Sequence, residues 1–496
     1  MRGSILTPEM RHRILAQIVP EREEISRQQR VVKRLTKALS EVAEEIGQSF
    51  VFIEPQGSTG AKQTQLRGAS DIDLFVGLSP REFSDILQQS APQRQAMLSE
   101  RFDELVDRWF WPAAQRAGGR NIIKAYSQHP YLSLVVEDID VDVIACFYLS
   151  PEELAENGPI TAVDRTIHHT RFVLDRINDT LRNDIRILKS FVRASHAYGD
   201  DCAVGQMGLT GYSLELITLF GNGIDGAVEM LLHIEDGPID PFGRPAHVLR
   251  RVPTFRDDHV ILIDPTDANR NVASSFSPRA VRWTITRLRH LIELRERGED
   301  DAVVDLVLER PIPTDPPPSW LAPHCITRQF VGARRVHYTL FRDKLHRLCR
   351  LIARVLRKEN TGEKRFGKTL WEVYFEQDHY AIGMIVEKPV IEPVYSRRGP
   401  PVDIEKAASA FRKKHPTAYE KDGYLWLDTK RRWTRAGDMI DYMIERHSIE
   451  GLEMTTEEGD VSRRVLNTLY RYVMRIEDFP LSRRQEYKDA EQTLGW

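Results

Sequence analysis

Two aspartates separated by one residue are the feature of this sequence from which chemistry can most directly be inferred. Asp71 and Asp73 open the alternating apolar segment at residues 71–76, which predicts a buried strand. Residues i and i+2 of a strand project from the same face, so both carboxylates can share a cation. A pair of this kind taken alone is most often a structural surface feature. Its apolar neighbours favour the chemical interpretation, because they bury acids that are otherwise costly to bury.

A second pair of aspartates, Asp140 and Asp142, has the same spacing on a strand predicted at residues 139–144. If the two strands are neighbours, a third carboxylate joins the first pair. Three close carboxylates repel one another and are tolerated only around metal. Mg²⁺ suits such a site, because it takes oxygen ligands and keeps positions for water and phosphate. Two such ions can lower the pKa of an attacking hydroxyl and neutralise a leaving pyrophosphate.

A glycine-led loop, Gly57-Ser58, lies thirteen residues before Asp71. Such a turn can offer backbone N–H groups and a hydroxyl to phosphate oxygens. Gly-Ser alone is a common turn, but before a buried Asp-x-Asp strand it becomes a specific signal for phosphate chemistry.

The elements that must position these residues form an N-terminal domain that mixes strands and helices. Predicted helices and strands of this domain cover residues 21–47, 50–53, 71–76, 91–116, 131–136 and 139–144. This mixture predicts an α/β or α+β domain that ends near residue 150.

The next part of the chain, residues 151–298, is expected to be mainly helical. Helical periodicity is present near residues 180–197, 211–220 and 278–297, and one short strand is predicted at 260–263. Residues 311–318 are rich in proline and predict a linker.

Beyond the linker the pattern again mixes strands and helices. The predicted elements are a strand at 326–331, a helix at 338–358, strands near 369–387, and helices near 434–447 and 460–475. The fold class is therefore α+β and multidomain. The expected boundaries are 1–150, 151–300, a linker at 301–318, and a smaller α+β C-terminal region at 319–496.

Charge is unevenly distributed along the chain, although the formal net charge is only −3. Residues 342–368 hold ten Lys/Arg against three Asp/Glu, and residues 397–435 hold eleven against five. The outward arginines of the 342–358 helix form either a solvated face or a contact to RNA phosphates, which positions RNA without reading its sequence.

Several classes of protein are disfavoured by composition. No apolar run is long enough to span a membrane, and the N-terminus lacks the apolar core of a signal peptide. Four separated cysteines without a CxxC pair argue against a zinc module or a disulfide framework and fit a reducing compartment. We therefore expect a cytoplasmic protein.

Taken together, these motifs resemble the polymerase-beta-like nucleotidyltransferase superfamily, and in detail the class I (archaeal-type) CCA-adding tRNA nucleotidyltransferases. The resemblance covers nearly the whole chain, is strongest up to about residue 275, and is faint beyond. The matching blocks lie at residues 57–58, 61–62, 64, 66–68, 71–75, 129–131, 141–143, 162–166, 186–189, 198–199, 211–212, 264–267 and 270–273, with a weaker one at 397–401.

The resemblance implies a polymerase-beta-like catalytic domain, a helical nucleotide- and RNA-binding central domain, and a C-terminal RNA-binding body and tail. It also implies that the catalytic metal ligands are Asp71, Asp73 and Asp142. The nucleotide-binding residues that it implies are Gly57, Ser58, Lys62, Thr166, His169, Lys189, Tyr198 and Arg270. His168 is the alternative to His169, because the local spacing allows either.

Other interpretations of three of these residues remain open on the sequence alone. Lys189 lies on a basic helix face that is ordinarily solvated. Tyr198 lies at a helix end, where tyrosine usually packs. Arg270 could simply pair with Asp267.

The function implied by the resemblance is template-independent addition of C, C and A to the 3′ end of tRNA. The expected substrates and partners are CTP, ATP and tRNA, with Mg²⁺ as cofactor and no membrane; a homodimer is left open. The main alternatives are a poly(A) polymerase or an oligoadenylate or cyclic-dinucleotide synthase of the same fold. A non-enzymatic RNA-binding protein is a third class, which predicts the loss of at least one carboxylate, and all three are present.

Overall fold

The structure is a computed structural model that describes residues 4–69, 71–126, 129–333, 337–457 and 459–493. It divides into two compact units. The first comprises residues 1–199 and 207–310, and the second comprises residues 200–206 and 311–496. The further division of the first unit into a catalytic domain at 1–150 and a central domain at 151–300 stays a prediction.

A five-stranded sheet of order β1-β2-β5-β4-β3 is the centre of the first unit's N-terminal half. Its strands are β1 (Phe52–Pro55), β2 (Ile72–Leu78), β3 (Arg120–Tyr126), β4 (Pro130–Val136) and β5 (Ile139–Phe147). β2 contains Asp73 and directly follows Asp71, and β5 contains Asp140 and Asp142. β2 and β5 run parallel and side by side, whereas the other pairs of neighbouring strands are antiparallel. The sequence predicted β2, β4 and β5 closely, placed β1 two residues early, and missed β3. β3 is an edge strand with mostly exposed side chains, so it lacks the apolar alternation that marks a strand.

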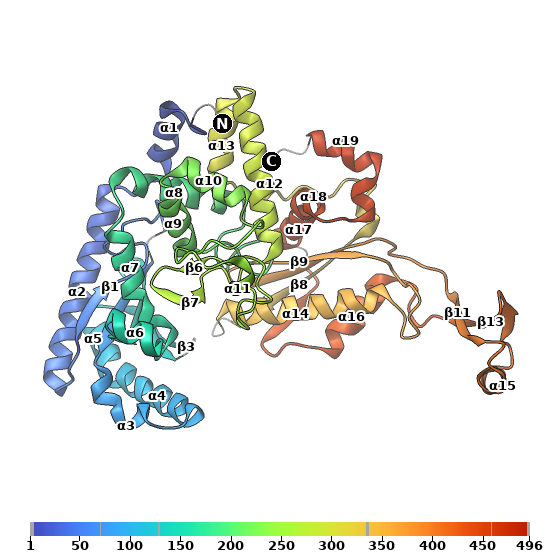
Figure 1. Cartoon of the computed structure of the whole chain (residues 1–496), viewed down its shortest axis with the longest axis horizontal. Coiled ribbons are helices and arrows are strands. Elements are labelled where there is room, and N and C mark those ends of the chain that lie inside the picture. The colour runs from blue at the N-terminus through green and yellow to red at the C-terminus, as the bar shows by residue number, and fades with distance from the viewer. Residues whose placement is uncertain (1–3, 70, 127–128, 334–336, 458, 494–496) are drawn as a thin grey trace. The chain divides into compact units, whose positions relative to one another are not determined.

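One face of this sheet is covered by long helices. α2 (Arg22–Ile46) runs along the sheet as the long blue helix in Figure 1. α4 (Ala91–Leu105), a π-helical turn at Val106–Phe110, and α5 (Trp111–Arg116) complete the cover. Side chains from these helices and alternate residues of β2, β4 and β5 form one continuous apolar core.

The opposite face of the sheet is available for the site. Phe52, Phe75 and Cys146 project to this side and pack with Ile167 of α7 (Thr166–Leu174). Because strand residues alternate, Asp73 and Asp142 lie on this same face, away from the α2 core.

The remainder of the first unit is helical, as predicted. It contains α1 (Pro8–Ile18), α3 (Ser84–Leu87), α6 (Pro151–Asn157), α8 (Asp179–Ala194), α9 (Gly211–Phe220), α10 (Ile224–Leu232), α11 (Ala246–Leu249), α12 (Pro278–Glu296) and α13 (Asp300–Val307), with 3₁₀ turns at Pro80–Phe83 and Ala162–Arg165. The bounds of the strand predicted at 260–263 are wrong. The structure has a short hairpin of β6 (Ile263–Asp264) and β7 (Asp267–Asn271) instead.

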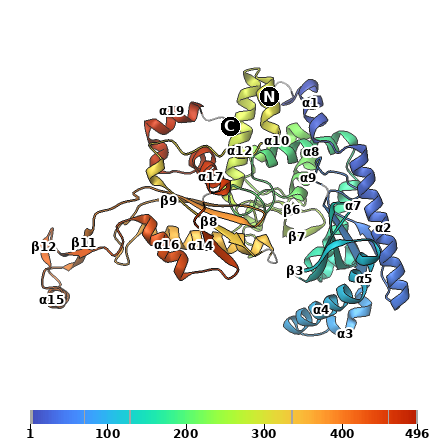
Figure 2. The same ribbon diagram turned by 180° about the vertical axis from the view of Figure 1, so that it is seen from behind.

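The second unit is built on a four-stranded antiparallel sheet of order β14-β8-β10-β9. These strands are β8 (Cys325–Gly332), β9 (Thr369–Glu376), β10 (His379–Val386) and β14 (Leu452–Thr455). α14 (Tyr338–Arg357) and α16 (Ala436–Arg446) pack on one face, and α17 (Asp460–Asn467) packs on the other (Figure 2). Of the linker predicted at 301–318, residues 301–307 belong to α13, whereas residues 308–318 contain no helix or strand.

A small three-stranded sheet belongs to the second unit as well. Its order is β11-β13-β12, with β11 (Val394–Pro401), β12 (Tyr419–Lys421), β13 (Tyr424–Lys430) and the helix α15 (Glu405–Lys414). The C-terminal end has a π-helical turn at Thr468–Val473, α18 (Met474–Ile476), a 3₁₀ turn at Pro480–Arg483 and α19 (Gln485–Thr493). Within the part of the chain that the structure describes, no helix is both long and apolar enough to cross a membrane.

Candidate active site

The aspartates of β2 and β5 meet on the face of the sheet that the α2 core leaves open. Asp73 and Asp142 are register partners in the parallel pair, and Asp71 immediately precedes β2. Burial raises the pKa of Asp73 to about 6, and repulsion from Asp142 and Asp71 adds to the effect. Burial, followed by repulsion from Asp140, also raises the pKa of Asp71. The carboxylates are therefore close enough to destabilise one another when ionised.

The type of ligand atom in this set of acids suits a divalent cation, although the side chains are not gathered into a complete metal site. Among the described residues, no three His, Cys, Asp or Glu side chains are gathered closely enough to hold a metal ion. The donor set is nevertheless composed of carboxylate oxygens, the ligands that hard divalent cations prefer. Mutual repulsion at a partly desolvated site is relieved by positive charge, which a cation between Asp71, Asp73 and Asp142 would supply.

The Gly57 loop lies directly against one of these carboxylates. Gly57 has a φ of +69°, and a Cβ added there would meet Asp73 Oδ2 at 2.7 Å. Thr59 Oγ1 donates to the carbonyl oxygen of Asp71 over 2.7 Å, and the Thr64 amide donates to the carbonyl oxygen of Ser58 over 2.9 Å. Glycine is thus required at position 57 both by the left-handed backbone and by the close approach to Asp73.

Two lysines converge on one buried glutamate in a network, here called the Glu215 network, formed by Lys62, Thr64, Lys189 and Glu215. Lys62 Nζ lies 2.7 Å from Glu215 Oε2, and Lys189 Nζ lies 2.8 Å from Glu215 Oε1. Thr64 Oγ1 donates to Glu215 Oε1 over 2.5 Å and accepts from Lys189 over 3.0 Å. Lys189 is therefore not on a solvated helix face, because only 2% of it is exposed.

Burial would raise the pKa of Glu215, but the two lysines outweigh it and lower the pKa to about 2. Tyr198 joins the same neighbourhood. A Cβ on Gly211, one helical turn before Glu215, would meet Tyr198 Oη at 2.7 Å and Lys189 Nζ at 3.7 Å. Sequence reasoning did not select Glu215. Its signal was a lone charged side chain in the otherwise apolar helix α9.

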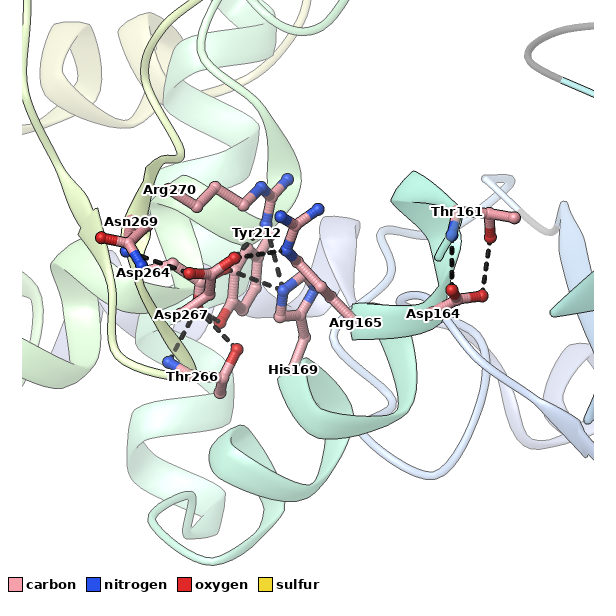
Figure 3. A network of polar contacts seen from close by, with 10 residues as sticks. All are labelled: Thr161, Asp164, Arg165, His169, Tyr212, Asp264, Thr266, Asp267, Asn269 and Arg270. Carbon is pink, nitrogen blue, oxygen red and sulfur yellow. Dashed lines mark hydrogen bonds and ion pairs between the residues drawn. The ribbon is translucent and has the colours of Figure 1, made fainter. Parts of the chain in front are cut away.

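A second polar network surrounds Asp264, at the end of β6. His169 Nε2 lies 2.9 Å from Asp264 Oδ2, and Arg270 Nη1 donates to the same oxygen over 2.7 Å. Tyr212 stacks on His169 at 4.1 Å between ring centroids and donates to Asp264 Oδ1 over 3.2 Å. Figure 3 shows His169, Tyr212 and Arg270 all directed toward Asp264.

The sequence left two questions open: whether Arg270 pairs with Asp267, and which of His168 and His169 lies at the site. The contacts of the Asp264 network bear on both. Arg270 pairs with Asp264, whereas Asp267 is paired with Arg165 Nε at 2.6 Å (Figure 3). His169 reaches the Asp264 network, while His168 Nε2 lies 3.0 Å from the carbonyl oxygen of Leu149. Burial would raise the pKa of Asp264, but His169 and Arg270 outweigh it, so Asp264 stays ionised; burial in turn lowers the pKa of His169.

A cavity of about 780 Å³ joins the aspartate face to the Asp264 network. Of the predicted site residues, Asp142, Thr166, His169 and Arg270 line it. Gly57, Ser58, Asp71, Asp73, Lys62, Lys189 and Tyr198 are not part of its lining. Two residues not selected from the sequence, His129 and Tyr131, also line it, and the described residues provide no hydrogen-bond partner for the buried His129 Nε2. This cavity therefore has Asp142 on one side and His169, Tyr212 and Arg270 on the other.

A family model described as "tRNA nucleotidyltransferase, second domain" matches residues 183–297. The chain is 25% identical to the CCA-adding enzyme of Pyrobaculum aerophilum over 90% of this chain and 96% of that protein. It is 28% identical to the CCA-adding enzyme of Pyrobaculum neutrophilum over 83% of this chain and 86% of that protein. It is 30% identical to the CCA-adding enzyme of Sulfurisphaera tokodaii over 44% of this chain and 46% of that protein.

Solved structures align more weakly with the chain. A structure of E. coli MS115-1 CdnC with ATP covers 61% of this chain and 96% of its own, at 18% identity and a TM-score of 0.43. A cytoplasmic RNA terminal U-transferase covers 61% of this chain and 98% of its own, at 13% identity and a TM-score of 0.43.

Proposed function

We propose that this chain is an archaeal-type CCA-adding tRNA nucleotidyltransferase, which adds C, C and A to the 3′ end of tRNA from CTP and ATP. The observation that carries the proposal is the match to a CCA-adding enzyme over 96% of that protein's length. The paired aspartates beside a nucleotide-sized cavity supply a site for the chemistry.

In the proposed reaction, the terminal 3′ oxygen of the RNA attacks the α-phosphorus of the nucleotide. A new P–O bond forms, the α–β phosphoanhydride bond breaks, and pyrophosphate leaves with that electron pair. Asp71, Asp73 and Asp142 are assigned as the ligands of the divalent metal that this family generally uses, with Mg²⁺ as the expected ion. When bound, such an ion lowers the pKa of the attacking hydroxyl and neutralises charge on the leaving pyrophosphate.

The phosphate groups are assigned to the side of the site around the Gly57 loop and the Glu215 network. Gly57 and Ser58 present a turn beside Asp73, where backbone N–H groups and a hydroxyl suit phosphate oxygens. Lys62, Lys189 and Tyr198 are assigned to the triphosphate, because ammonium groups are compact phosphate ligands.

Base selection is assigned to the Asp264 network. Arg270 has a fixed fork of N–H donors that suits base edges. Asp264 accepts a hydrogen bond from Arg270 Nη1 and also contacts His169 and Tyr212, and all three of these side chains line the cavity. Thr166 and His169 are assigned to the sugar or phosphates.

RNA contacts are assigned to the basic face of α14 in the second unit. Arg347, Arg350, Arg354 and Arg357 are exposed, while Leu345, Ile352 and Leu356 are buried against the sheet. Three of these arginines line a groove of about 650 Å³. A row of exposed guanidinium groups can bind the phosphates of a nucleic-acid backbone, and such contacts do not depend on the base sequence. A cytoplasmic location stays a prediction, and a homodimer stays open.

One assay tests the proposal. A tRNA transcript that lacks its 3′ CCA is incubated with Mg²⁺ and with CTP, ATP or both, and products are resolved to single nucleotides. Addition of two C and one A, lost in Asp73→Ala, is expected. Long A tails would support a poly(A) polymerase, and products formed without RNA would support an oligoadenylate or cyclic-dinucleotide synthase; either would overturn the proposal.

A further inference from the structure

The Glu215 network joins two parts of the first unit that are far apart in sequence. Lys62 lies in the loop before β2, Lys189 on α8, and Glu215 on α9. The two oxygens of one carboxylate each hold one ammonium group, at 2.7 Å and 2.8 Å. Only 4% of Lys62, 2% of Lys189 and 1% of Glu215 is exposed, so solvent does not screen these contacts.

The charges in this network do not cancel. Two ammonium groups and one carboxylate leave a net charge of +1 in a buried place. Lys189 places hydrogen bonds on Glu215 Oε1, Thr64 Oγ1 and the carbonyl oxygen of Thr64, which uses all three of its donors. Lys62 makes one hydrogen bond, to Glu215, and lies 5.9 Å from the ring centroid of Tyr212, which lines the cavity. The excess positive charge therefore lies on the side of the network that borders the cavity.

Glu215 also decides between two partners for Lys62. Lys62 also interacts electrostatically with Asp73. Without Glu215, Asp73 is an acid that could attract the ammonium group of Lys62. A Lys62–Asp73 pair would compete with a divalent cation and would withdraw the ammonium from a triphosphate.

We propose that Glu215 is a positioning residue that holds Lys62 beside Lys189, so that the two remaining donors of Lys62 receive the terminal phosphates and the site selects a nucleoside triphosphate over a monophosphate. This inference rests on the proposed function, because it takes Lys62 as a phosphate ligand. Glu215 itself does not touch the substrate. Its effect is common to CTP and ATP, since both carry the same phosphates, whereas the Asp264 network acts on the base.

The variant Glu215→Gln tests this inference. The affinities of the full chain for CTP and for CMP are measured by calorimetry in the presence of Mg²⁺ and without RNA. CTP affinity is expected to fall about tenfold or more, as expected when charge-assisted contacts are lost, while CMP affinity stays within about twofold. Glu229→Gln on α10, whose side chain is exposed, is the matched control and leaves both affinities unchanged. A parallel fall for CTP and CMP would mean a purely structural role and would overturn the inference.

A kinetic measurement adds a second readout. In Glu215→Gln the KM values for CTP and ATP are expected to rise by the same factor, and inhibition by pyrophosphate to weaken in parallel, with a smaller change in kcat. Unequal effects on the two nucleotides would overturn the inference.

Thr64→Val covers the case in which Glu215→Gln does not fold. It removes a hydroxyl that contacts both Glu215 and Lys189 but leaves all three charges in place. The ratio of CTP to CMP affinity is expected to fall about two- to fivefold, and an unchanged ratio would overturn the inference. Because these binding assays contain no tRNA, their outcome is independent of whether the enzyme makes CCA.

Discussion

Asp73, which is half-buried, and Glu215, which is buried, are two acids of the same unit whose surroundings have opposite effects on ionisation. The pKa of Asp73 is raised to about 6 by burial and by neighbouring aspartates, whereas the pKa of Glu215 is lowered to about 2 by two lysines that outweigh burial. Glu215 has its counter-charges in the protein itself. Asp73 lacks comparable compensation and is left to be neutralised by a group from outside. The difference separates an acid that stabilises the fold from an acid whose ionisation costs stability and which we assign to a metal.

The largest expected effect is on catalysis by Asp73→Asn. Losing a metal ligand is expected to lower kcat by on the order of 10³-fold in the CCA-addition assay. The same change removes a repelled, desolvated charge, so the free energy of unfolding in urea is expected to rise by about 1–3 kcal/mol. Asp85→Asn, an exposed acid on α3, is the control. Lower stability in Asp73→Asn would contradict the comparison.

Glu215→Ala is expected to change stability in the opposite direction. It leaves two buried ammonium groups without their carboxylate, so the free energy of unfolding should fall by about 3–5 kcal/mol. Glu229→Ala, at an exposed position on α10, should change it by about 0.5 kcal/mol or less. Denaturant titration measures both. If Glu215→Ala lowered the free energy of unfolding by less than about 1 kcal/mol, this would show that solvent reaches the two lysines.

Gly57→Ala tests the close approach of the loop to Asp73. An added methyl group meets Asp73 Oδ2 at 2.7 Å, and displacing this carboxylate is expected to lower kcat by about 10²-fold. Gly68→Ala is the matched control, because Gly68 has a similar φ of +75° but nothing within 4 Å of an added Cβ. The two variants should lose similar stability from backbone strain, and only Gly57→Ala should lose activity. Equal activities would refute a role for the close contact.

The smallest expected effect concerns the pH dependence of stability. The folded-state pKa of Glu215 is lowered from 4.5 to about 2, so its stabilising contribution is complete above about pH 4.5 and is lost as pH falls toward 2. Between pH 7 and pH 3.5 the wild type should lose about 1–2 kcal/mol more than Glu215→Gln. Urea unfolding at both pH values measures the difference. Parallel pH curves for the two proteins would show that Glu215 is not held ionised by the lysines.

Local patterns were sufficient for much of the fold. The apolar stripe of residues 21–47, the helices near 180–197 and 278–297, and the strands that carry Asp73 and Asp142 all correspond to elements of the structure. Each of these has a clear period, because one of its faces packs into a core. β3 and the β6–β7 hairpin were not predicted correctly, since an exposed edge strand and a very short hairpin have little periodicity.

The sequence by itself indicated the type of chemistry, from carboxylates spaced two residues apart and a glycine-led loop before the first pair. That Asp142 joins Asp71 and Asp73 was decided by the parallel pairing of β2 and β5. The tertiary structure decided which partners each charge has. Glu215 meets Lys62 across 153 positions, and His169 meets Asp264 across 95. No local pattern encodes such distant contacts, because they arise only when separate elements pack and desolvate the charges together. For the Asp-x-Asp pair the same packing had the opposite result: it placed the exposed Asp71 and the half-buried Asp73 beside one another and raised the pKa of both.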